Sequence, residues 1–155
     1  MVVASAVSRA HVEDELREAR EWADRHRWSI VWRPDQLVLE VSMRSAIDGE
    51  AYEFEISLDD YRALPPAFEL RHLATGERGT RRCYPKGGLG YFHNQPVLCA
   101  PWNRKAYAAL GGPHSDWAMA QWSTYRPNHT RLGDILALIQ NLLDDRSSYE
   151  GRMAR

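Results

Sequence analysis

The sequence has few cysteines and no long apolar run. Cys83 and Cys99 are its two cysteines, which is too few for a disulfide scaffold and typical of a reducing compartment. No stretch reaches the roughly 18 to 20 apolar residues of a membrane-spanning helix, and residues 1–10 lack the charged start and apolar run of a signal peptide. We therefore expect a soluble, cytoplasmic protein with no membrane partner.

An excess of charge is also missing. Twenty Lys and Arg residues face 21 Asp and Glu residues, so the formal net charge is −1 and no general attraction to nucleic acid is expected. A local basic run contains few interleaved aromatic residues, which favours a solvated loop or a docking surface for an acidic partner over a nucleic-acid site. The run consists of Arg71, Arg78, Arg81, Arg82 and Lys86.

The composition is that of one folded domain. A chain of 155 residues with 44% hydrophobic residues and six tryptophans can bury a core of its own. We expect a single domain over residues 1–155, with a core of about 8–145 and a short tail at 146–155.

Periodicity predicts the secondary structure. Apolar residues recur at helical spacing over 8–26, and again over 130–145 through Leu132, Ile135, Leu136, Ile139 and Leu143. Between these helices, apolar and polar residues alternate in four segments, with Asp48-Gly49 as a turn. The segments are 28–33, 37–44, 52–58 and 67–72, and no further strand is expected. The order predicts an α+β fold in which a four-stranded antiparallel meander carries the helices on one face.

Three segments resemble the ubiquitin-conjugating (UBC) family. Residues 59–68 read DDYRALPPAF and are similar to the family's Tyr-Pro-x-x-Pro-Pro element, with Arg62 where the family usually has the first Pro. Residues 93–99 read HNQPVLC and look like a compressed form of the family's His-Pro-Asn stretch and its thioester-forming cysteine. Trp122 and the helix at 135–145 are similar to the family's tryptophan and to the helix that follows its active site. The long segment between Trp102 and Trp122 looks more like divergent bacterial members, some encoded beside cyclic-oligonucleotide antiphage systems.

The resemblance implies an activity and partners. Cys99 would accept an acyl group from the C-terminus of a ubiquitin-like protein or of a nucleotidyltransferase and pass it to an acceptor amine, and an adenylating enzyme is a further expected partner. By the same resemblance, His93 would orient the loop and Asn94 would stand for the oxyanion-stabilising Asn, although it lies closer to the cysteine than usual. The chain would be a cysteine acyltransferase of antiviral defence that needs no cofactor.

The residues around Cys99 suit such chemistry. Acyl transfer needs donors near the sulfur and a base for the incoming amine. Candidate donors or positioning groups are Asn94, Asn103 and Trp102, and His114 with Asp116 forms a candidate acid–base pair. Candidate cations for partner docking are Arg81, Arg82, Lys86, Arg104 and Lys105.

Other interpretations of these residues remain open. Cys99 and Cys83 can be buried packing, Cys83 can be a redox partner of Cys99, and the His114–Asp116 pair can stabilise its own loop. Zinc ligation is not expected because the cysteines and histidines lack local chelating spacing, and the glycine-rich run 86–90 lacks the P-loop ending. The main alternative function is a catalytically inert UBC-like binding or adaptor module.

Overall fold

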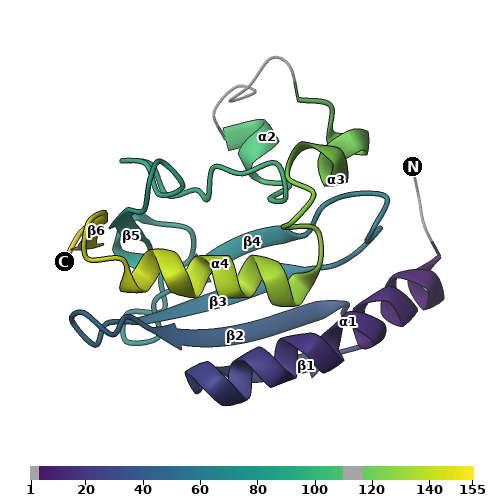
Figure 1. Cartoon of the computed structure of the whole chain (residues 1–155), viewed down its shortest axis with the longest axis horizontal. Coiled ribbons are helices and arrows are strands. Elements are labelled where there is room, and N and C mark those ends of the chain that lie inside the picture. Colours follow the sequence, from purple (N-terminus) through teal and green to yellow (C-terminus); the bar gives the residue numbers. More distant parts are fainter. Residues whose placement is uncertain (1–3, 110–116) are drawn as a thin grey trace.

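A four-stranded antiparallel sheet forms the centre of the protein (Figure 1). The structure is a computed structural model and describes residues 4–109 and 117–155. The strand order follows the sequence, and the α+β class with an antiparallel meander is confirmed. The strands are β1 (Ser29–Arg33), β2 (Val38–Arg44), β3 (Ala51–Ser57) and β4 (Ala67–Arg71).

Alternation along the strands divides the sheet into an apolar and a charged face. Val41 of β2 is in register with Phe54 of β3, which is in register with Leu70 of β4, and all three are buried. Their sequence neighbours point the other way, as the two-residue period of a strand requires. An outward row of Glu40, Glu55 and Glu69 results, and it is paired with Arg33, Arg71, Arg78 and Lys105.

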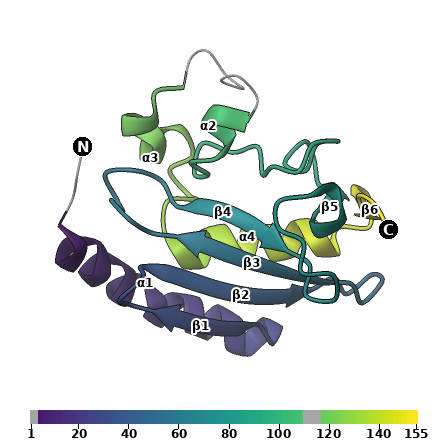
Figure 2. The same cartoon turned by 180° about the vertical axis from the view of Figure 1, so that it is seen from behind.

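Two long helices cover the apolar face. Helix α1 (Ser5–His26) and helix α4 (Leu132–Asp144) lie side by side on this face, and the opposite view shows the strands in front of them (Figures 1 and 2). They approach closely at Gly133, where an added Cβ would lie 3.3 Å from the backbone nitrogen of Ala19. The five predicted apolar positions of α4 are all buried.

A second, two-stranded sheet was not predicted. It pairs β5 (Pro85–Gly87) with β6 (Tyr149–Arg152), so the expectation of no strand after residue 72 was wrong, and part of the predicted tail is a strand. Neither segment alternates in hydrophobicity. The strand β5 contains proline and glycine. Gly87 has a φ of +93°, and the Ser148 carbonyl oxygen lies so close that it leaves no room for a Cβ at this position.

Short elements fill the long segment between β4 and α4. They are the 3-10 helices η1 (Arg81–Cys83) and η2 (Met119–Gln121), and the single turns α2 (Ala106–Ala109) and α3 (Trp122–Tyr125). Both views place α2 and α3 on the β4 side of the sheet, away from β1 (Figures 1 and 2). Among the described residues, no helix combines the length and apolar character that crossing a membrane requires.

Candidate functional site

The candidate cysteine lies on a strand-like segment attached to the small sheet. The Cys99 N–H donates to the Tyr91 carbonyl at 2.9 Å, and Leu98 forms an antiparallel bridge with Phe92. Phe92 in turn pairs with Gly87 of β5, through a hydrogen bond of 3.1 Å. The local pairing therefore places the cysteine at the outer end of a ladder that starts at β6.

The same segment is also attached to the main sheet. The buried Asn103 side chain accepts a hydrogen bond from the Phe68 N–H of β4 at 3.0 Å and donates to the Leu98 carbonyl at 2.8 Å. The backbone N–H of Arg104 donates to the Pro66 carbonyl at 2.8 Å. Asn103 and Arg104 thus lie beside the first part of the outer edge of β4, at Pro66 and Phe68.

The Cys99 thiol is partly exposed, whereas its neighbours Leu98 and Ala100 are buried. Burial of the sulfur raises the pKa of the Cys99 thiol, because desolvation disfavours the thiolate. Within residues 4–109 and 117–155, no side chain is hydrogen-bonded to this sulfur. The described structure therefore holds the thiol in place without an activating partner.

Cys83 has a different environment. It is fully buried, and its sulfur contacts the Thr80 hydroxyl and the Glu77 carbonyl, both at 3.4 Å. Its surroundings are those of a packed core residue.

Among the described residues, the polar side chains predicted around Cys99 form no hydrogen bond with its sulfur. His93 and Asn94 are exposed, and in the described part of the chain their side chains make no hydrogen bond; only the Asn94 backbone carbonyl is used, by Arg81. The candidate pair His114 and Asp116 lies outside the described residues.

Trp102 packs under the cysteine segment. It is fully buried, stacks on Tyr91 with ring centroids 6.2 Å apart, and meets Phe68 edge-on at 5.3 Å. Its indole N–H is buried with no hydrogen-bond partner among the described residues. Trp102 therefore supports the residue whose carbonyl binds Cys99, and full burial keeps it from an acyl group at the surface.

Most of the cations predicted for partner docking have partners within the fold. Arg82 pairs with Glu77, Arg104 with Asp59 and Lys105 with Glu69, each at 3.0 Å. Arg81 binds the Asn94 carbonyl. Lys86 forms no ion pair with any described residue. Of the five predicted docking cations, it is therefore the one whose charge has no partner within the described part of the fold.

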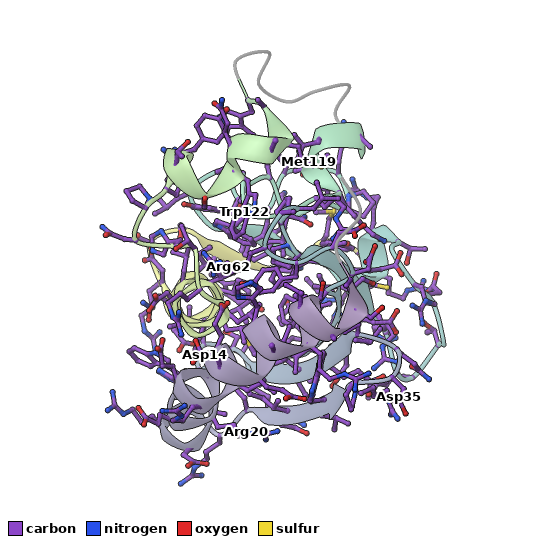
Figure 3. All side chains as sticks on the ribbon, turned by 90° about the vertical axis from the view of Figure 1, so that its right-hand side faces the viewer. Asp14, Arg20, Asp35, Arg62, Met119 and Trp122 are labelled. Atoms are coloured by element: carbon purple, nitrogen blue, oxygen red, sulfur yellow. The ribbon has the colours of Figure 1, made fainter. Side chains whose placement is uncertain are left out.

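A buried charged cluster near α1 was missed in the sequence. Glu15 accepts from the Tyr61 hydroxyl at 2.7 Å, from the Leu132 N–H at 2.7 Å and from the Arg62 guanidinium at 2.9 Å. Arg62 also faces the Trp122 ring, and Figure 3 shows these two side chains next to each other. The available signal was the position of Glu15 within the apolar stripe of the helix.

Arg62 stands where the UBC element that residues 59–68 resemble usually has a proline, and it has contacts of its own. Beside the ion pair with Glu15, its guanidinium donates to the Thr130 carbonyl at 2.9 Å, and its own carbonyl accepts from the Trp122 indole N–H at 3.1 Å. A proline at this position would supply no such charge. Arg62 therefore links the β3–β4 connection to α1, α3 and the start of α4.

Metal ligation and a hollow are two alternatives to chemistry at Cys99 within the described residues. No group of three or more His, Cys, Asp or Glu side chains among them is arranged to hold a metal ion. A hollow of about 260 Å³ is lined by Arg44, Arg71, His72 and Arg152 among others, and none of its lining residues belongs to the cysteine segment.

Comparison with family models, with curated proteins and with solved structures found no match for this chain.

Proposed function

We propose that the chain is a UBC-like acyl carrier that forms a thioester on Cys99. The donor would be the C-terminus of a ubiquitin-like protein or of a nucleotidyltransferase, activated by an adenylating enzyme, and the acceptor would be an amine, in antiphage defence. One observation carries the proposal: a partly exposed thiol lies on a firmly held segment between the meander and α4. The order of helix, meander, cysteine segment and helix supports it.

The chemistry requires two acyl transfers. In the first, the Cys99 thiolate attacks the thioester carbonyl that joins the donor's C-terminus to a cysteine of the activating enzyme, and the thiolate of that enzyme leaves and takes up the proton that Cys99 has lost. In the second, an amine attacks the Cys99 thioester, loses a proton to a base and releases the Cys99 thiolate. Because the pKa of the Cys99 thiol is raised by burial, we expect the bound donor complex to provide the base or positive charge that activates it.

The test is an adduct that excess thiol removes. Wild-type protein recovered from its native cells should carry an added mass that disappears on incubation with reductant. Cys99→Ser should instead retain the acyl group as an ester, which resists reductant, and Cys99→Ala should carry none. Cys83→Ala is the matched control and should be charged normally, since Cys83 is buried. Wild-type and Cys99→Ser protein that both lack an adduct in cells where the system is active would refute the proposal.

His114 provides a separate test of the second transfer. The acceptor amine needs a base in the second transfer, whereas the donor complex is expected to activate Cys99 in the first, so His114→Ala should leave charging of Cys99 near normal and slow discharge to lysine by ~10²-fold. Discharge would be followed as loss of the reductant-sensitive adduct after lysine is added. Equal discharge rates in the variant and the wild type would remove His114 from the mechanism.

The alternative is an inert UBC-like adaptor. It is favoured by the absence, within the described residues, of any side chain hydrogen-bonded to the Cys99 sulfur, together with the raised pKa of this thiol. An adaptor needs the fold and not the thiol. Cys99→Ala that keeps full activity in cells and still binds the partner would therefore select the adaptor.

A further inference from the structure

The peptide group before the candidate cysteine is held from both sides. Its carbonyl, that of Leu98, accepts from the Asn103 side chain at 2.8 Å, and its N–H, that of Cys99, donates to the Tyr91 carbonyl at 2.9 Å. Because a peptide unit is planar, fixing both of its polar groups fixes the orientation of the plane and with it the position of the Cys99 Cα, from which the side chain leaves the backbone.

The two partners of this peptide are attached to different sheets. Tyr91 precedes Phe92, which pairs with β5, while Asn103 accepts from Phe68 on the edge of β4 at 3.0 Å. An edge strand leaves alternate N–H and C=O groups without a partner in the sheet, and Asn103 supplies one for Phe68. The Asn103 side chain thus connects the main sheet directly to the peptide group that precedes Cys99.

An amide is the side chain that this position requires. Asn103 is fully buried, and its side chain must accept from the Phe68 N–H while it donates to the Leu98 carbonyl; its oxygen also accepts locally from the Lys105 N–H at 3.3 Å. A carboxylate accepts only and an aliphatic side chain does neither, so each would leave a buried backbone group unsatisfied.

We propose that Asn103 is a positioning residue for Cys99 that sets how far the thiol is exposed, and that it does not touch the acyl group. Its importance for acyl transfer rests on the proposed function. The placement of the thiol can be measured without any acyl donor, by the rate at which iodoacetamide alkylates each cysteine in the folded protein. Mass spectrometry separates the two sites.

The two cysteines provide an internal comparison. Cys83 is fully buried, so its alkylation reports opening of the whole core, whereas Cys99 is partly exposed and reports its own segment. Asn103→Ala should accelerate alkylation of Cys99 by about three- to tenfold relative to Cys83, the change expected when one buried hydrogen bond no longer limits local opening.

Gln140→Ala is the matched control. Gln140 is also a buried amide, accepts from the Trp28 indole N–H at 2.7 Å and donates to the Arg44 carbonyl at 2.9 Å, and makes no hydrogen bond to residues 98–104. Its loss should weaken the core and so accelerate alkylation of Cys83, but it leaves the contacts of the cysteine segment intact, so the ratio of Cys99 to Cys83 alkylation should not rise.

Two results would overturn the proposal. One is Cys99 alkylation in Asn103→Ala that is unchanged or slower than in the wild type, and the other is an equal change in the ratio in both variants. If Asn103→Ala does not fold, Asn103→Ser retains a hydroxyl for one of the two backbone partners and should show a smaller rise, whereas an unchanged ratio would again contradict the proposal. Since no acyl donor is used, failure here is distinct from failure to find a thioester.

Discussion

Replacing Glu15 by Gln tests the buried cluster that connects α1 to the rest of the fold. The Glu15 side chain is 1% exposed and accepts three hydrogen bonds, from Tyr61, Arg62 and the Leu132 N–H. Gln has nearly the same size, so the substitution leaves no large cavity. It removes the negative charge and places an NH₂ group where at least one of the three donors now points.

The expected loss follows from these contacts. A hydrogen bond to a charged group contributes about 1.5–3 kcal/mol, and breaking a buried ion pair from one side costs about 3–5 kcal/mol. The Arg62 side chain is 27% exposed and can regain some water, which lowers the second figure. We therefore expect Glu15→Gln to lower the free energy of unfolding by about 2–4 kcal/mol.

Glu18→Gln is the control on the same helix. Glu18 pairs with Arg131 at 3.0 Å, but its side chain is 49% exposed, so its removal should cost about 0–1 kcal/mol. Urea unfolding followed by tryptophan fluorescence measures both variants, with equal slopes confirming that the unfolding transition is comparable. Equal losses in the two variants would refute the argument that burial makes the Glu15 contacts strong.

Two further predictions concern the thiol and the small sheet. Burial raises the pKa of the Cys99 thiol, so less thiolate is present near neutral pH than in a free cysteine. In a Cys83→Ala background, the alkylation rate of Cys99 should therefore reach half its maximum at a pH above about 8.5, the ordinary pKa of cysteine. A midpoint at or below that pH would contradict this expectation. Gly87→Ala should lower the free energy of unfolding by about 2–4 kcal/mol, since its Cβ would lie 2.0 Å from the Ser148 carbonyl oxygen. Gly49→Ala, at a φ that is also positive but with open space around the Cβ, should cost about 1 kcal/mol. Similar losses at both glycines, by urea unfolding, would show that β5 and β6 do not constrain Gly87.

Local periodicity was sufficient for the elements that pack by one face. Val12, Leu16, Ala19 and Ala23 of α1, the apolar positions of α4 and the alternation in β2 and β3 all lie where the sequence predicts, because burial of one face determines which residues must be apolar. The candidate cysteine was likewise identified from the sequence, and its partly exposed thiol lies on the long segment before α4.

The tertiary structure alone decided the contacts that depend on residues far apart in the chain. Pairing of β5 with β6 joins segments more than sixty positions apart, and neither has a pattern of its own. Glu15 is stable in an apolar stripe only because Tyr61 and Arg62 arrive from the β3–β4 connection. Asn103 could equally serve an oxyanion or the backbone by its chemistry. Its place beside the edge of β4 decided that it binds the backbone. A hydrogen bond is directional and its partner is determined by the fold, whereas hydrophobic burial requires only the correct side of an element.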